Sequence, residues 1–209
     1  MASFKIEREF VKKILIEKLK NPKIFYNKTI QSCSPFPKEN EKIVEQLIKE
    51  EKIKRVGKQL TITEKGRKSI KVVLCGGTFD IIHPGHLLTL KKAKSLGDIL
   101  VVIVATDGTA EKTRGRKPYN NEEKRLELVS SLRIVDLAIV GEKGNIYNTL
   151  LKINPDIVVL GYDQIHKEKE IEEFAKSRGM KIKVIRLTKN IRGIKSSALL
   201  KDNNLFNEI

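Results

Sequence analysis

CGGTFDIIHPGH, residues 75–86, is the stretch that decides the fold of this chain. It follows the apolar residues 72–74, which have the composition of a buried strand. The paired glycines near its start allow the backbone to turn and to approach a ligand closely, and Pro84 suits the first turn of a helix. The stretch therefore predicts a buried strand, a tight turn and a helix in succession.

Two histidines, His83 and His86, lie at the start of that predicted helix. Free backbone amides and the positive end of the helix dipole attract phosphate there, and residues three apart share one face of a helix. Both imidazoles can then donate N–H bonds to one phosphate group as its charge grows, and the loss of one donor costs about 3 kcal/mol. Paired histidines also cap helices, so a structural role stays open. The eight specified positions arise together by chance on the order of once in ten billion trials.

On these residues, GGTFD followed by HxGH, the segment 71–209 resembles the cytidylyltransferase-like family of nucleotidyltransferases. Within that family it is most similar to archaeal-type FAD synthases. The closer similarity rests on GRKP ahead of an acidic-then-arginine helix, on RIVDLAIVG at residues 133–141 and on NPDIVVLGYDQ at residues 154–164. The resemblance implies transfer of AMP from ATP to FMN, which gives FAD and pyrophosphate with the help of Mg²⁺.

The resemblance also implies roles for individual residues. It makes His83, His86, Lys117 and Arg125 catalytic, with the Arg125 fork clamping phosphate. Residues that bind the nucleotide would be Gly76, Gly77, Thr78, Phe79, His83, His86, Gly161, Asp163, Ser196 and Ser197. Residues that bind the acceptor would be Asp80, Asp107, Arg114 and Arg116.

Ordinary structural roles compete with several of these assignments. Residues 112–118, similar to the mobile basic loop of the family, also fit a solvated charge run, and Asp107 also fits a turn carboxylate. Arg125 also suits the surface of a helix, and Ser196 suits a helix N-cap.

The segment around residues 190–197 departs from relatives that use CTP. Asn190 and Arg192 stand where those relatives carry an arginine and a glutamate, which argues against CTP. Two rival functions are kept. One is a CTP-dependent cytidylyltransferase of a phospho-alcohol, or a pantetheine-phosphate adenylyltransferase, and the other is a DNA-binding regulator with a nucleotide-sensing domain.

The second part of the chain, residues 70–209, alternates apolar runs with helical patterns. Strands are predicted at residues 72–74, 99–104, 135–140, 157–160 and 182–187, and helices at 85–96, 121–132, 145–153 and 168–178. A short final helix is predicted to open near residue 193. This pattern predicts an α/β fold, a Rossmann-like doubly wound parallel five-stranded sheet of order 3-2-1-4-5, whose ligands bind at the carboxyl ends of the strands.

Residues 1–69 are predicted to form a separate small domain. Three helices, with the second near residues 23–31 and the third opened by Pro37, precede a hairpin of residues 52–56 and 59–63. This order resembles a winged helix-turn-helix domain. Because residues 38–51 hold five glutamates against three lysines, DNA binding is not favoured, and a role in dimerisation, in packing beside the active site or in sensing the bound product is preferred.

Composition limits the remaining classes. The formal net charge of +16 implies anionic partners without choosing among them, and no apolar run is long enough to span a bilayer. Cys33 and Cys75 form no metal-ligand pattern and fit a reducing compartment, so a cytoplasmic location without a protein-bound metal is expected. His166 is expected to be a solvated surface residue. A homodimer is left open.

Overall fold

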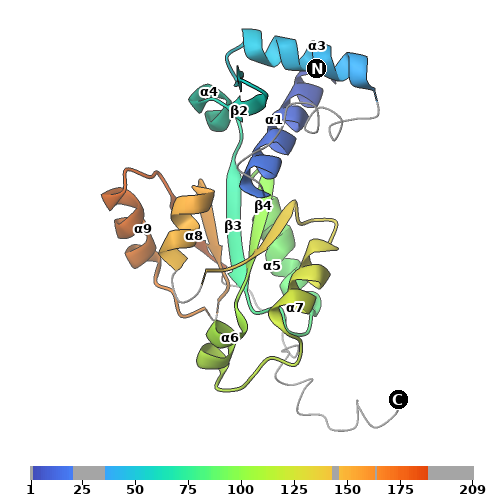
Figure 1. Ribbon diagram of the computed structural model, residues 1–209. Coiled ribbons are helices and arrows are strands. Elements are labelled where there is room, and N and C mark those ends of the chain that lie inside the picture. Colours follow the sequence, from blue (N-terminus) through green and yellow to red (C-terminus); the bar gives the residue numbers. More distant parts are fainter. Residues whose placement is uncertain (1, 21–35, 143–145, 163, 188–209) are drawn as a thin grey trace. The chain divides into compact units, whose positions relative to one another are not determined.

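In the computed structural model, which describes residues 2–20, 36–142, 146–162 and 164–187, the chain divides into two compact units. The first unit is Met1–Lys71 and the second is Val72–Ile209 (Figure 1). Within the described residues, no helix is both long and apolar enough to cross a membrane.

The first unit contains helices and one small antiparallel sheet. Helices α1 (Ala2–Lys20) and α3 (Pro37–Lys49) precede a hairpin of β1 (Ile53–Val56) and β2 (Gln59–Ile62). The predicted helix at Pro37 and the predicted hairpin are confirmed, whereas residues 23–31 lie outside the described part. The core of this unit is apolar and comes from both helices and the hairpin, through Phe10, Val11, Ile14, Leu15, Val44, Leu47, Ile53 and Leu60.

A short helix, α4 (Glu64–Lys68), closes the first unit and was not predicted. Thr63 caps it, because its hydroxyl accepts a hydrogen bond from the Gly66 amide at 3.0 Å. The same hydroxyl donates to the Lys52 carbonyl at 3.0 Å, which joins α4 to the residue before β1. Resemblance of this unit to a winged helix stays a prediction.

The second unit is built on a five-stranded parallel sheet. Its strands are β3 (Val72–Gly77), β4 (Ile99–Val104), β5 (Leu137–Val140), β6 (Ile157–Leu160) and β7 (Lys183–Arg186). Their order is β5-β4-β3-β6-β7, and every neighbouring pair is parallel. Numbered within this unit, that order is 3-2-1-4-5, so the predicted Rossmann-like topology is confirmed.

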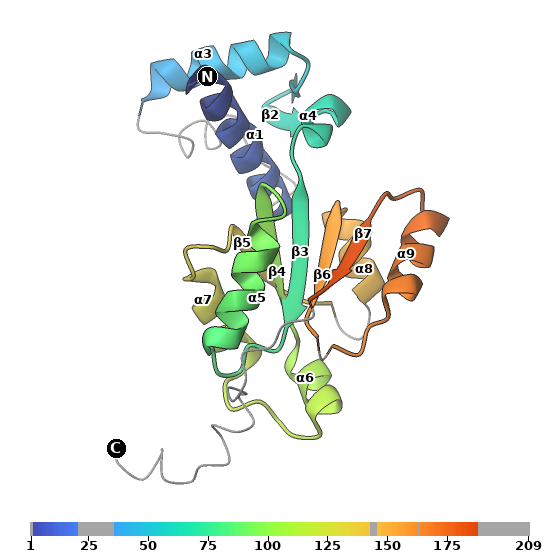
Figure 2. The same ribbon diagram turned by 180° about the vertical axis from the view of Figure 1, so that it is seen from behind.

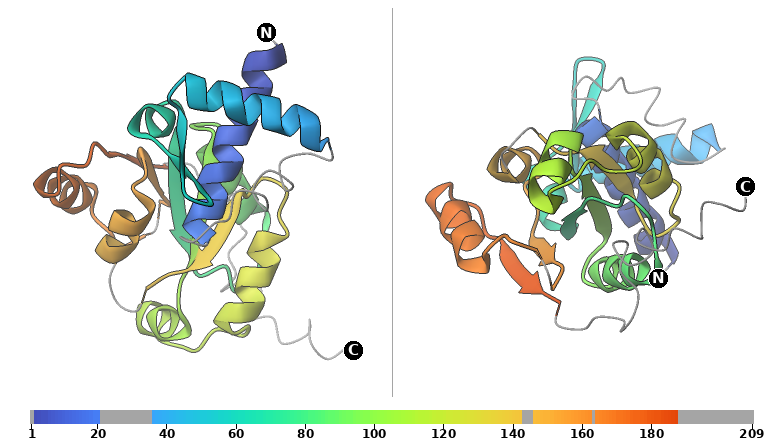
Figure 3. Two further views of the ribbon diagram at one scale, coloured as in Figure 1. Left: turned by 45° about the horizontal axis from the view of Figure 1, so that its top comes forward. Right: turned by 90° about the horizontal axis from the view of Figure 1, so that it is seen from below.

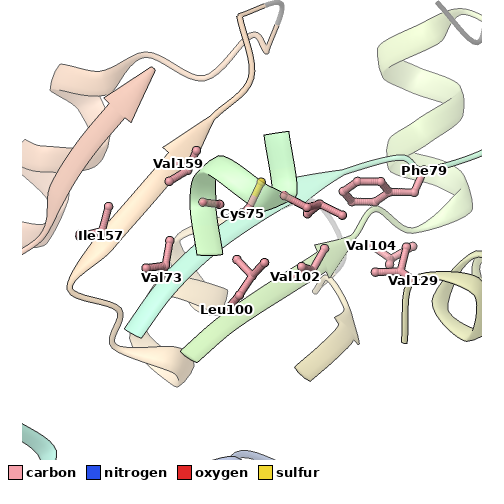
Figure 4. Packing of buried hydrophobic residues seen from close by; sticks show 11 residues of the cluster. Val73, Cys75, Phe79, Leu100, Val102, Val104, Val129, Ile157 and Val159 are labelled. Carbon is pink, nitrogen blue, oxygen red and sulfur yellow. The ribbon is translucent and has the colours of Figure 1, made fainter. Parts of the chain in front are cut away.

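Alternate residues of the strands face one hydrophobic cluster, as Figure 4 shows. Helices α5 (Pro84–Lys94) and α7 (Glu122–Ser130) contribute to it, and Figure 2 shows α5 in front of β4, running roughly along the strands. Helices α8 (Ile146–Ile153) and α9 (Glu168–Ser177) lie alongside β6 and β7 (Figure 1). The cluster comprises Val73, Cys75, Phe79, Leu90, Ala93, Leu100, Val102, Val104, Val129, Ile157 and Val159.

One further helix differs from the sequence prediction. Residues 112–114, expected within a basic loop, form the last turn of α6 (Asp107–Arg114), which follows β4. The Thr106 hydroxyl accepts from the Thr109 amide at 3.2 Å at its start, and Gly115 ends it in the left-handed conformation at φ 72°. Figure 3 (right) shows α6 in the view from below. The basic loop therefore begins at Gly115.

Candidate active site

The predicted site residues lie where parallel strands end. Gly76 and Gly77 are the last residues of β3, Asp107 opens α6 after β4, and Gly161 follows β6. Because β4, β3 and β6 are adjacent and parallel, their carboxyl ends meet at one edge of the sheet. Residues far apart in the sequence are thereby brought together.

The two histidines stack on each other at the start of α5. The ring centroids of His83 and His86 are 3.9 Å apart, with 29° between the ring planes. His83 is the N-cap of the helix, and its Nδ1 accepts a hydrogen bond from the Gly85 amide at 3.1 Å. His86 Nδ1 accepts from the His83 amide at 3.4 Å. Both residues therefore cap the helix through one nitrogen.

This capping determines which ring nitrogen carries the proton. A neutral imidazole has one donor and one acceptor nitrogen, so an Nδ1 that accepts from the backbone leaves the proton on Nε2. Both His83 and His86 then present an Nε2–H donor. The capping role and the phosphate-binding role, which were alternatives on sequence alone, are compatible in one arrangement because they use different atoms.

His86 is held in its neutral form. Burial, with a smaller electrostatic influence from the neighbouring His83 and Arg114, lowers the pKa of His86 to about 4. The His86 ring therefore donates as an uncharged imidazole at neutral pH. The influence of Arg114 on this pKa also shows that Arg114, the last residue of α6, is close enough to His86 to interact with it electrostatically.

Phe79 orients His86 from the turn before the helix. Its ring is buried and lies 5.2 Å from the His86 ring, centroid to centroid. The backbone of Phe79 has φ 53°, in the left-handed region that a bulky residue rarely adopts. A Cβ on Gly77 would come within 3.0 Å of the Phe79 ring, which explains the glycine. Phe79 thus supports a histidine from within the hydrophobic core.

Arg125 occupies a different place from the predicted phosphate clamp. Its side chain is fully buried, and its guanidinium donates to three backbone carbonyls and one carboxylate. The partners are Thr78 O at 2.6 Å, Ala105 O at 2.8 Å, Asn120 O at 2.9 Å and Asp107 Oδ1 at 2.6 Å. In this arrangement Arg125 joins the ends of β3 and β4 to the start of α7 and does not offer its fork to a ligand.

Asp80 is likewise occupied by the protein. It is fully buried, its Oδ1 accepts from the Asn120 amide at 2.9 Å, and its Oδ2 is 3.4 Å from both terminal nitrogens of Arg116. Asn120 Nδ2 also donates to the Asp80 carbonyl at 2.9 Å. The predicted acceptor contacts Asp80 and Arg116 thus bind each other and hold the loop before α7 against the GTFD turn. Asp107, the third predicted acceptor residue, is paired with Arg125.

The loop between α6 and α7 carries basic side chains, and another ends α6. Lys117 and Arg114 are exposed, and Arg116, half-buried, donates from Nη1 to the Lys117 carbonyl at 2.9 Å. The side chains of Lys117 and Arg114 are therefore accessible to an anionic ligand. Their contacts with nucleotide or acceptor remain predictions.

Three predicted nucleotide contacts, Asp163, Ser196 and Ser197, lie outside the described residues, as does the predicted final helix.

Cys75 is buried in β3, and burial raises the pKa of its thiol to about 12, which makes it an inert core residue. His166 is half-buried, and burial lowers its pKa, so it differs from the solvated residue expected.

Sequence reasoning missed several polar residues of this edge. Asn120 holds Asp80, Glu122 Oε2 accepts from the Asp107 amide at 2.7 Å, and Gln164 Nε2 donates to the Gly76 carbonyl at 2.5 Å. Asn121 caps α7 through a bond from the Lys124 amide at 3.0 Å. The pair Asn120-Asn121 ahead of Glu122 is a typical start of a helix and could have been recognised in the sequence. The contact of Gln164 with Gly76 could not, because the two residues are 88 positions apart.

A protein-only metal centre is not found in the described part of the chain, where no three His, Cys, Asp or Glu side chains gather to hold an ion. Among the described residues, the acidic side chains predicted at this edge are Asp80 and Asp107, and each is paired with an arginine. This set suits a divalent cation that arrives bound to phosphates, because Mg²⁺ takes most of its ligands from substrate oxygens and water.

We expect Arg125→Met to lower the free energy of unfolding by about 3–5 kcal/mol, because it leaves buried carbonyls and the Asp107 carboxylate without their donor. Lys124→Met, an exposed change on the same helix, is the control and should have little effect. Urea unfolding followed by circular dichroism measures both. An Arg125→Met protein as stable as the control would contradict the structural role.

A second prediction concerns acid. The pKa of His86 is about 4 in the folded protein and about 6.5 when unfolded, so between these values the unfolded chain binds the proton more readily. The contribution of neutral His86 to the free energy of unfolding is complete above pH 6.5 and is lost as the pH falls to about 4. We therefore expect Tm to fall more between pH 7 and pH 4 in the wild type than in His86→Asn, by differential scanning fluorimetry. Parallel curves would refute the shift.

Comparison with known proteins agrees with this geometry. Residues 74–202 match the family described as Cytidylyltransferase-like. A FAD synthase of Aciduliprofundum boonei is 52% identical over 117 residues, which cover 56% of this chain and 78% of that protein. A FAD synthase of Picrophilus torridus is 45% identical over 126 residues, which cover 60% of this chain and 90% of that protein.

A solved structure shares both sequence and fold with the second unit. The crystal structure described as the lipopolysaccharide core biosynthesis protein from Thermoplasma volcanium has a TM-score of 0.56 and 42% sequence identity, and the match covers 58% of this chain and 99% of that chain. With its paired imidazoles, its parallel sheet and a family match over more than half of its length, the chain belongs to the cytidylyltransferase-like family.

Proposed function

We propose that this protein is a nucleotidyltransferase that transfers AMP from ATP to FMN and releases FAD and pyrophosphate. The observation that carries the proposal is the stacked His83–His86 pair, held by backbone bonds to both Nδ1 atoms, at the start of a helix that follows the first strand of the sheet. Identity of 52% and 45% to two FAD synthases supports FMN as the acceptor.

The reaction needs alignment and charge stabilisation. An oxygen of the FMN phosphate attacks the α-phosphorus of ATP, a new P–O bond forms, and the bond between the α-phosphorus and the bridging oxygen of pyrophosphate breaks. A phosphomonoester has a second pKa of about 6, so at neutral pH it attacks without a general base. His83 and His86 donate from Nε2 to the phosphate oxygens that gain charge, and their bonds to the backbone hold them in place beforehand.

The basic residues beside the histidines assist the leaving group. Lys117 and Arg114 have exposed side chains, and Arg114 is near enough to affect the pKa of His86. Positive charge at this place stabilises the departing pyrophosphate. Mg²⁺ bound to ATP would supply further positive charge against the phosphate oxygens, and Arg114 and Lys117 would add theirs from the protein.

The neutral state of His86 also suits a triphosphate site. A histidine that remains uncharged keeps the Nδ1 bond to the His83 amide, which a second ring proton would break. Donor geometry is therefore preserved across the pH range in which phosphates are ionised.

A direct assay tests the function. We expect FAD and pyrophosphate from ATP, Mg²⁺ and FMN, with pyrophosphate measured enzymatically and FAD identified by chromatography and mass. Parallel incubations pair ATP and CTP in turn with FMN, phosphopantetheine and glycerol 3-phosphate. Turnover with CTP alone, or with ATP and phosphopantetheine but not FMN, would overturn the proposal.

The roles of the two His86 nitrogens can be separated. His86→Asn keeps an acceptor close to the position of Nδ1 and removes the Nε2–H donor, so we expect kcat to fall about 10²–10³-fold with a largely retained Tm. His86→Ala removes both functions and should lose stability as well as turnover. Steady-state kinetics with thermal unfolding distinguishes the two variants. Normal turnover by His86→Asn would exclude His86 from phosphate stabilisation.

A further inference from the structure

Arg186, at the end of β7, uses all five N–H groups of its guanidinium on one short segment. Nη1 donates to Gly161 O at 3.1 Å and to Gln164 O at 2.9 Å, while Nη2 donates to His166 O at 2.5 Å. Nε and Nη2 complete a two-pronged pair with Glu168, at 2.5 Å and 3.1 Å. One side chain thereby satisfies three carbonyls of the segment after β6 and the first residue of α9.

This segment reaches the glycine turn of the histidine site. Gln164, whose carbonyl accepts from Arg186, donates through Nε2 to the Gly76 carbonyl at 2.5 Å. Gly76 is near the end of β3, beside Gly77 and the GTFD turn. A continuous series of hydrogen bonds therefore runs from Arg186 through the Gln164 backbone and side chain to the start of the phosphate site.

A lysine cannot replace this arrangement. Its ammonium has three donors on one nitrogen, whereas the five acceptors around Arg186 are spread over the planar fork. Carbonyls left without donors would turn toward water and the segment would adopt another course. The bond to Arg186 lowers the pKa of Glu168 to about 2, so the ion pair persists across the working pH range.

The segment lies at the edge of the sheet where nucleotide binding is predicted. It follows β6, which pairs with β3, and it contains Gly161, predicted from sequence to bind nucleotide. While its carbonyls are bound to Arg186, the side chains of Tyr162 and Ile165 are exposed, Ile165 by 73%. Ile165 is therefore an exposed apolar side chain on the segment that Arg186 holds through its carbonyls.

We propose that Arg186 is a positioning residue of the ATP-binding half of the site, acting through the segment after β6 and without touching substrate. The inference rests on the proposed function. Because Arg186 acts on nucleotide placement, its loss raises the KM for ATP, while the KM for FMN and the stabilisation by the histidines change little.

Arg186→Lys is the test, with Arg178→Lys as the matched control. Arg178 lies over the Phe174 ring at 5.8 Å, at the other end of α9. We expect the KM for ATP to rise about tenfold or more in Arg186→Lys, with kcat and the KM for FMN within about threefold of wild type. Arg178→Lys should leave all three constants unchanged.

Two further variants keep the test valid if Arg186→Lys does not fold. Gln164→Ala removes the bond to Gly76 and leaves the carbonyl of residue 164 for Arg186, so the KM for ATP should rise with Tm nearly unchanged. Glu168→Gln keeps the carbonyl contacts and removes one charge, so its effect should be smaller. Affinity for ATP measured by titration calorimetry should follow the same order.

The outcomes separate the two claims. If the wild type makes no FAD from ATP and FMN, the proposed function fails. If the wild type makes FAD but Arg186→Lys and Gln164→Ala leave the KM for ATP unchanged, the positioning role fails and the function stands. A lower Tm and lower kcat with unchanged KM values would assign Arg186 to folding alone, and would also overturn the inference.

Discussion

The buried guanidinium of Arg125 is the constraint on which the described site depends. Carbonyls at the ends of β3 and β4 and before α7 converge on it, together with the Asp107 carboxylate. Chain ends of parallel strands carry carbonyls that the sheet no longer pairs, and a buried carbonyl without a donor is costly. One planar cation with several directed donors satisfies them together. The loops around the histidines are thereby held in one arrangement before any ligand binds.

The histidine pair is likewise held by hydrogen bonds to the backbone. His83 and His86 each use Nδ1 to cap α5, which fixes the orientation of the ring and puts the proton of the neutral imidazole on Nε2. Phe79 has a left-handed backbone conformation, its ring lies close to Gly77, and it supports the His86 ring from the core. Preorganisation of this kind lets neutral donors stabilise charge that develops on phosphate oxygens without rearrangement during the reaction. The site combines helix capping and anion recognition in the same two side chains.

Much of the second unit was predictable because its signals are local. The β-branched runs of buried strands and the alternation with helices give a parallel sheet, and the right-handed rule for crossovers restricts its order. The histidine pair was readable for the same reason, since both residues belong to one helix start. Helix α6 was missed although Thr106 and Gly115 are ordinary cap residues, because the cations between them were interpreted as a loop. Arg125 and Asp80 were predicted to face ligands, and the structure buries both.

By itself, the sequence determined the order of the strands, the position of the paired imidazoles and the resemblance to a family, since these follow from periodicity and from motif residues close along the chain. Tertiary structure alone decided where each charged side chain points. Asp80 meets Arg116 across 36 positions and Gln164 meets Gly76 across 88, and nothing local in the chain indicates such partners. The physical reason is that a polar or charged side chain can be buried only where partner groups converge, and that place exists only after the strands have assembled into a sheet.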